Sequence, residues 1–322
     1  MSRRSRALFG ALALAASSVA CGGGGASGAS GHAVAAQPAQ HAMPDFEGDA
    51  TDGEASTHFW SHGGSPGSEA LVLVNGGPGL GHESMDPLQN ALASPAWQVV
   101  TYDQRGIGRS TAPGTAAFTP DEYVADLETL RRRLGKERLH LLGHSFGGMV
   151  ALLYLDRHPD RVASLILVDP GVANLDAMQQ GGEAIGRHIA ELQRQGLVPD
   201  PIPKASCRER TLAVMPAYFA DPRFPLPAAL QRRSCDASGR SAVLQAFMNA
   251  TYTSGVGEAT LPALLLFGAA DPLRPASHAA AAALAHARLT QVELPACGHL
   301  GWFECPQPFY GAVHRFLDGV AR

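Results

Sequence analysis

The feature that most constrains this chain is residues 138–149, RLHLLGHSFGGM, with Ser145 at the centre. Three leucines before the serine have the pattern of a short buried strand, and residues 148–155 after it have the apolar pattern of a helix. G-x-S-x-G in a strand-to-helix turn holds the serine side chain in the open, and its glycines permit the tight bend. The helix N-terminus would stabilise negative charge there. We therefore predict that Ser145 is a catalytic nucleophile.

The composition is that of a globular protein and gives no indication of a nucleic-acid partner. Of the 322 residues, 45% are hydrophobic and 17% are charged, so the chain can bury a large core. The formal net charge of −4 favours neither nucleic acid nor an acidic membrane surface as a partner.

The N-terminus has the pattern of an export signal, since three arginines precede an apolar run at residues 7–20 that is too short for a membrane anchor. Ser18 and Ala20 suit ordinary signal peptidase. Cys21 and the glycines after it resemble a bacterial lipobox, in which the cysteine is lipidated, although Ser18 stands where a large aliphatic residue is usual. Either route predicts export, as a periplasmic or cell-envelope lipoprotein or as a secreted protein.

Export predicts that the other cysteines form disulfides. They are Cys207, Cys235, Cys297 and Cys305. Three pairings are open, and we favour Cys207–Cys235 with Cys297–Cys305 because both are local. The cysteine spacing fits no zinc site, so we predict no metal.

Apolar runs alternate with helical patterns along much of the chain. The predicted strands are residues 70–74, 97–102, 139–142, 164–168, 263–267 and 290–294. Continuous apolar runs are typical of strands buried on both faces, and their alternation with helices predicts a mostly parallel α/β sheet with helices on both faces.

This alternation breaks at residues 171–257, where helical patterns are separated by proline-rich pieces. Such a segment is too long for a loop, and we predict an inserted helical lid. The predicted organisation is therefore a signal peptide at residues 1–20, a flexible tether at 21–42, and a core formed by 43–170 and 258–322.

A serine nucleophile needs a base that is oriented by an acid. In hydrolases built on such a sheet the acid and then the histidine follow the serine in the chain. Asp271 directly follows the strand at residues 263–267, which places it on the same sheet edge as Ser145. Asp169 also ends a strand and is the alternative acid.

Among the 13 histidines, His299 combines a loop after the last strand with the right chain order, so we predict that it is the base. His144 adjoins the nucleophile, but its side chain should point away from it. His82, in the loop after Gly79, is expected at the rim of the site.

The oxyanion hole is predicted to use the backbone N–H of Phe146 and one from the Gly76-Gly77 turn, where glycine lets the backbone approach a substrate carbonyl. Asn75 either orders that loop by hydrogen bonding or serves ordinary turn chemistry.

Three motifs carry a family resemblance: NGGPG at 75–79, DQRGIGRS at 103–110 and GHSFGG at 143–148. Together they resemble the proline iminopeptidase branch of the α/β-hydrolases, peptidase family S33. The resemblance extends from about residue 45 to the C-terminus and includes Asp271, His299 and residues 302–304. It implies the α/β-hydrolase fold and release of an N-terminal residue, often proline, from peptides or amides without a cofactor.

The family holds the substrate's free amine with glutamates of the lid region. The candidate substrate-binding residues are Glu183, Glu191, Glu209 and Glu304. Residues 248–255 lack a glutamate where the second one is expected, and Asn75 stands where the family usually has histidine.

We therefore expect an exported serine hydrolase that acts through an acyl-enzyme as an aminopeptidase on small peptides or amides. The alternative is an esterase or lactonase with the same triad. A ligand-binding lipoprotein without activity is disfavoured, because a binding protein has no need of all three triad residues.

Overall fold

The computed structural model describes residues 45–114, 118–204, 206–236, 238, 240–252 and 255–321. The expected signal peptide, the tether and Cys21 lie outside the described residues.

Eight strands form one sheet in the order β1-β2-β4-β3-β5-β6-β7-β8. Their bounds are β1 (Phe46–Asp52), β2 (Ala55–Gly63), β3 (Glu69–Val74), β4 (Trp97–Tyr102), β5 (Leu139–His144), β6 (Val162–Val168), β7 (Pro262–Gly268) and β8 (Arg288–Leu294). The two N-terminal strands pair antiparallel, and β2 pairs antiparallel with β4. Every further pairing, from β4 to β8, is parallel. The predicted mostly parallel sheet is confirmed.

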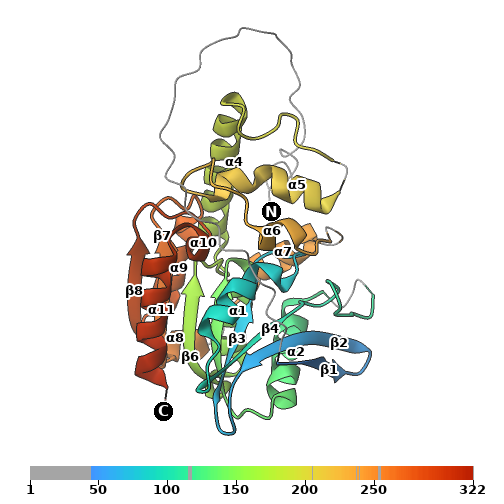
Figure 1. The fold of residues 1–322 in the computed structure, drawn as a ribbon, viewed down its shortest axis with the longest axis vertical. Helices are drawn as coiled ribbons and strands as arrows, with labels where there is room; N and C mark the ends of the chain where they lie inside the picture. Colours follow the sequence, from blue (N-terminus) through green and yellow to red (C-terminus); the bar gives the residue numbers. More distant parts are fainter. Residues whose placement is uncertain are drawn as a thin grey trace.

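Helices cover both faces of this sheet (Figure 1). One apolar core contains residues of α2 (Pro120–Arg133), α3 (Phe146–Arg157) and α9 (Arg274–Ala283), and the other contains residues of α1 (Asp86–Leu92) and α11 (Pro306–Val320). Strand β3 supplies both cores, with Val72 in the first and Leu71 and Leu73 in the second. Successive strand side chains point to opposite faces, which explains why the central strands are apolar throughout.

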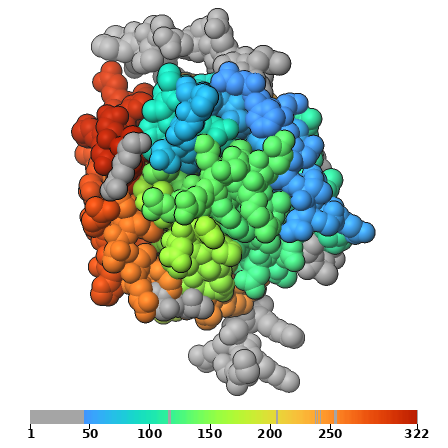
Figure 2. Space-filling view, turned by 90° about the horizontal axis from the view of Figure 1, so that it is seen from below, coloured from blue at the N-terminus to red at the C-terminus, as the bar shows by residue number. Residues whose placement is uncertain are grey.

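A helical segment separates β6 from β7 at the place of the predicted lid, and we call this segment the lid. It contains α4 (Leu175–Arg194), α5 (Cys207–Val214), η4 (Met215–Tyr218), α6 (Ala228–Arg232), α7 (Arg240–Met248) and α8 (Gly255–Glu258). Figure 1 shows α4, α5 and α6 beyond the carboxyl ends of the strands. Seen from below, the N-terminal strands (blue) and the C-terminal part (orange to red) lie on opposite sides of the molecule (Figure 2).

Both favoured disulfides are present, Cys207–Cys235 in the lid and Cys297–Cys305 around the loop that carries His299. Within the described ranges, the helices are all too short or too polar to cross a membrane.

Candidate active site

Ser145 lies between β5 and α3 in a strained backbone conformation. Its φ is 52° and its ψ is −121°, a region that residues with a side chain rarely adopt. A Cβ at Gly143 would collide with the carbonyl of Gly147, and one at Gly147 would collide with the carbonyl of Val74. The two glycines are therefore required for the turn. The Ser145 carbonyl accepts hydrogen bonds from the N–H groups of Gly148 (2.9 Å) and Gly171 (2.7 Å), which stabilise the turn.

Asp271 and His299 form a hydrogen-bonded pair at the carboxyl edge of the sheet. Asp271 follows β7, His299 follows β8, and Oδ2 of the aspartate lies 3.0 Å from Nδ1 of the histidine. Their side chains are 0% and 5% exposed, so water competes little for this contact. The pairing places the Nδ1 proton toward the carboxylate and leaves Nε2 to exchange protons.

The loop that carries His299 is tied to the lid. The N–H of His299 donates to the carbonyl of Tyr218 over 2.8 Å. Glu304 accepts from the N–H of Gly298 (2.7 Å) and from the N–H of Ala220 (2.6 Å). The position of the histidine therefore depends on contacts between the core and the lid.

Asp169, the alternative acid, is a neighbour of this pair. Its Oδ1 accepts a hydrogen bond from the N–H of Gly268 over 2.9 Å. One carboxylate oxygen of Asp169, one of Asp271 and one ring nitrogen of His299 all lie within 4.8 Å of one another. Burial raises the pKa of Asp169 well above its usual value, and the charge of Asp271 raises it further. This shift favours the protonated form of Asp169, which can donate a hydrogen bond to Asp271 and so keep the negative charge beside the histidine.

The loop after β3 approaches the nucleophile closely. A Cβ at Gly76 would lie 2.8 Å from Nδ1 of His144 and 3.1 Å from Cβ of Ser145, so only a glycine leaves this space free. Asn75 is buried and donates through Nδ2 to the carbonyls of Gly76 (3.0 Å) and Leu80 (2.7 Å). This arrangement places the Gly76 backbone next to Ser145, which Phe146, the first residue of α3, follows in the chain.

Comparisons with known proteins agree with this geometry. A family model described as alpha/beta hydrolase fold matches residues 69–188. This chain has the α/β-hydrolase fold.

Its relatives include proline iminopeptidases. That of Lactobacillus delbrueckii subsp. bulgaricus is 44% identical over 101 residues, which cover 30% of this chain and 34% of the relative. That of Clostridioides difficile (strain 630) is 40% identical over 103 residues, which cover 31% of this chain and 35% of the relative. The matches thus span about a third of these relatives.

Solved structures match over most of the chain. A proline iminopeptidase-related protein from Thermus thermophilus has a TM-score of 0.66 and 28% identity, with 87% of this chain and 99% of the other covered. A membrane phospholipase A described as a bacterial virulence factor has a TM-score of 0.64 and 25% identity, with 85% and 86% covered. The Mycobacterium smegmatis proline iminopeptidase, at 21% identity, a TM-score of 0.63 and 86% and 99% coverage, supports the fold.

In this fold, His144 holds the loop of the predicted base. Its Nε2 lies 2.9 Å from the carbonyl of His299, to which it donates. Burial lowers the pKa of His144 well below its usual value, and the nearby His299 and Arg233 lower it further, so its ring is neutral. The His144 side chain points to the loop of the predicted base, whereas its place in the sequence predicted only that it would point away from Ser145.

The glutamates that the resemblance offers for substrate binding are either exposed or already engaged by backbone N–H groups. The side chains of Glu183 and Glu191 are 57% and 47% exposed and form ion pairs with arginines of their own helix. Glu209 is exposed at the start of α5, where it bonds with Ser206. Glu304 is engaged by the two backbone N–H groups described above. These positions give the geometry of a free-amine site no support.

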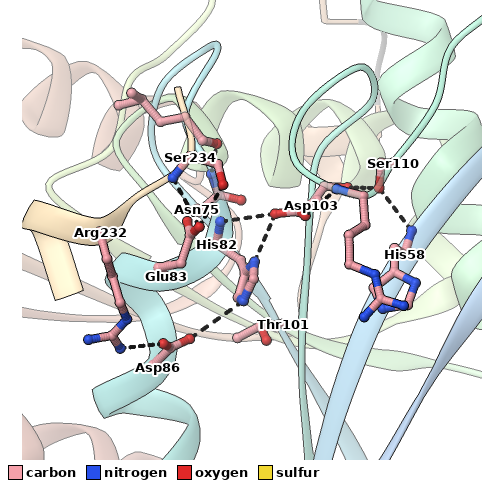
Figure 3. Close-up of polar contacts among 12 residues, drawn as sticks. His58, Asn75, His82, Glu83, Asp86, Thr101, Asp103, Ser110, Arg232 and Ser234 are labelled. Atoms are coloured by element: carbon pink, nitrogen blue, oxygen red, sulfur yellow. Dashed lines mark hydrogen bonds and ion pairs between the residues drawn. The ribbon is translucent and has the colours of Figure 1, made fainter. Parts of the chain in front are cut away.

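Sequence reasoning missed a contact between the lid and residues 75–81, the loop after β3 that we call the oxyanion loop because it contains the predicted Gly76-Gly77 turn. The N–H of Gly81 donates to the carbonyl of Ser234 (2.8 Å), and the N–H of Asp236 donates to the carbonyl of Gly79 (2.9 Å). The Ser234 hydroxyl donates a hydrogen bond to Oε1 of Glu83 over 2.7 Å (Figure 3). The nearest sequence signal was Cys235, whose disulfide partner lies in α5 and whose backbone bridges Leu80.

His82 reinforces the oxyanion loop from the core side. It stacks on Trp60 with ring centroids 3.7 Å apart, and its Nδ1 lies 2.8 Å from Asp103 (Figure 3). Burial lowers its pKa, but the hydrogen bond and charge of Asp103 outweigh burial and leave that pKa raised. Asp86, 3.7 Å from His82, also pairs with Arg232 of the lid (2.7 Å). Asp103, the first residue of the DQRGIGRS motif, is thereby linked to the lid through His82 and Asp86.

Proposed function

We propose that this chain is a serine hydrolase with Ser145 as nucleophile, His299 as general base and Asp271 as the acid that orients it. The observation that carries the proposal is the buried 3.0 Å contact between Asp271 and His299 on the sheet edge where Ser145 stands in a strained turn.

In the proposed reaction, the Ser145 hydroxyl attacks the substrate carbonyl carbon while Nε2 of His299 takes its proton. The oxyanion accepts hydrogen bonds from the backbone of Phe146 and of the Gly76-Gly77 turn. Collapse of the tetrahedral intermediate breaks the bond to the leaving amine or alcohol, which takes the proton from His299. Water, activated by the same histidine, then hydrolyses the acyl-enzyme.

The partial identity with proline iminopeptidases favours an aminopeptidase that acts on small peptides or amides. Such an enzyme must hold a charged amine against a carboxylate. The exposure of Glu183, Glu191 and Glu209 favours a second candidate, an esterase or lactonase with the same triad.

We also propose that the protein is exported. The basic and apolar pattern of residues 1–20 and the two disulfides support this, and Cys21 is the proposed lipidation site.

The test combines active-site labelling with a substrate panel. A fluorophosphonate probe should label the wild type and leave Ser145→Ala unlabelled. Aminoacyl amides, N-acetylated aminoacyl amides and short-acyl esters, compared by kcat/KM, then separate the two candidates. Equal labelling of both proteins, or no turnover of any substrate, would contradict a serine hydrolase.

A further inference from the structure

Two arginines of the lid lie beside the oxyanion loop. Arg233 directly follows α6 and is 7% exposed, and the half-buried Arg240 begins α7. The residues between them include Ser234 and Asp236, which hydrogen-bond to the loop at residues 79–81. Both arginines therefore belong to the part of the lid that contacts the core next to the nucleophile.

Neither guanidinium has an acidic partner among the described residues. Within that part of the chain, no carboxylate oxygen lies within 4.0 Å of the side-chain nitrogens of Arg233 or Arg240. The ion pairs of other residues, such as Arg232 with Asp86, are closer than this. Burial and the positive charge of Arg240 together lower the pKa of Arg233 to about 10. Glu83 is the acidic group that acts on Arg233, but its Oε1 is bonded to Ser234. Two neighbouring cations that are shielded from water are unfavourable without a counter-anion.

A structural arginine of the same chain is arranged differently. Arg105 is also buried, at 2% exposure, and it contacts Asp126 at 2.7 and 2.9 Å and Glu122 at 3.0 Å. This protein thus compensates a buried guanidinium with carboxylates where the role is to hold the fold. The two lid arginines lack such compensation within the described ranges, which is typical of groups whose partner is a ligand.

Their positions relative to the triad fit a substrate group. The charge of Arg233 acts on His144, which adjoins Ser145 and bonds to the His299 carbonyl. Cβ of Arg240 lies 3.9 Å from the place a Cβ of Gly79 would occupy. Tyr218, whose hydroxyl both arginine charges affect, has its ring 5.4 Å from that of His299.

The guanidinium of Arg233 keeps a small contact with solvent. Some side-chain nitrogens of the described residues are completely sealed from solvent and lack a hydrogen bond. The nitrogens of Arg233 are not among them. These nitrogens have no hydrogen-bond partner in that part of the chain, so they are free to bind an anion. Arg233 lines a crevice there with Leu80 and Thr211.

We propose that Arg233 and Arg240 bind an anionic group of the substrate, a carboxylate or a phosphate, while its ester or amide carbonyl lies at Ser145. The inference rests on the proposed serine hydrolase. It names the substrate class of that site as acyl compounds with a negatively charged group near the scissile bond. Guanidinium groups bind both oxyanions through paired, charge-assisted hydrogen bonds. A substrate with a free ammonium group at this point would be repelled.

The experiment compares acetyl esters that differ in one charge: 4-acetoxybenzoate, its neutral methyl ester, and 1-acetylglycerol 3-phosphate against 1-acetylglycerol. The wild type should prefer each anionic ester by about 10-fold or more in kcat/KM. Arg233→Gln and Arg240→Gln should each raise KM for the anionic esters by about 10-fold and leave the neutral esters within about 2-fold. The larger preference, for carboxylate or phosphate, identifies the group.

Arg187→Gln is the matched control, because Arg187 is a lid arginine whose side chain is 72% exposed. Arg233→Lys keeps the charge and should restore part of the lost affinity, which a defect of folding would not do. As a measurement independent of variants, 4-hydroxybenzoate or inorganic phosphate should competitively inhibit hydrolysis of the neutral methyl ester by the wild type.

Equal kcat/KM for charged and neutral esters, with no inhibition by either anion, would overturn the inference and leave the hydrolase proposal intact. Failure of every ester and of the fluorophosphonate probe would instead contradict the hydrolase itself. Preference for aminoacyl amides with a free amine would overturn the inference in favour of the aminopeptidase.

Discussion

Replacing Asp169 by asparagine separates the two aspartates beside His299. The raised pKa favours a protonated Asp169 that accepts from Gly268 and can donate to Asp271. An asparagine can replace it, because its Oδ1 accepts and its Nδ2 donates. We expect Asp169→Asn to keep kcat within about 3-fold of the wild type. Such a change corresponds to less free energy than a typical hydrogen bond contributes. Asp271→Asn removes the carboxylate beside the histidine and should lower kcat by roughly 10⁴-fold.

The same change alters how stability depends on pH. Burial raises the folded-state pKa of Asp169 above its unfolded value of about 4, so the folded protein retains a proton that the unfolded chain releases. The stabilisation is complete below the unfolded pKa and is lost as pH rises toward the folded pKa. Across that window the wild type loses about 1.4 kcal/mol of unfolding free energy per pH unit from this group, a loss that Asp169→Asn avoids.

The assay is urea unfolding of both proteins at pH 5, 6, 7 and 8, with kcat measured at each pH on the same ester. The stability of Asp169→Asn relative to the wild type should increase with pH. A difference in stability that does not change with pH would refute the neutral state of Asp169. A severe kcat defect in Asp169→Asn with a mild one in Asp271→Asn would reverse the assignment of the acid.

Three further changes test other parts of the site. Ser145→Ala or His299→Ala should each lower kcat by roughly 10³-fold or more without changing the melting temperature, and near-normal turnover would refute the role of that residue. Gly76→Ala places a methyl group 3.1 Å from Cβ of Ser145 and should lower kcat by about 10-fold or more, measured on a neutral ester; an unchanged kcat would show that the loop does not border the reacting carbonyl. Loss of the Cys207–Cys235 bond, which spans 28 residues, should cost about 3–4 kcal/mol in urea unfolding, and unchanged stability of the double serine variant would contradict a structural role.

Much of the site follows from the sequence alone, for local reasons. The strained turn at Ser145 was predictable because a glycine-flanked serine between a strand and a helix admits few backbone conformations. Asp271 and His299 were predictable as neighbours because each directly follows a strand, and parallel strands bring their carboxyl ends to one edge of the sheet. The same locality favoured the disulfide pairings that the structure contains.

Other features depended on packing between distant segments. Asp169 and Asp271 both follow neighbouring strands, and only the three-dimensional arrangement decides which carboxylate contacts His299. The lid was recognisable as helical, but the side of each helix that meets the core is set by contacts more than a hundred residues apart, such as Ser234 with Glu83. Sequence reasoning therefore looked for glutamates in the lid, whereas the fold buries Arg233 next to the loop at residues 79–81 and leaves Glu183 and Glu191 at the surface. Burial is a property of the packed chain and not of residue type.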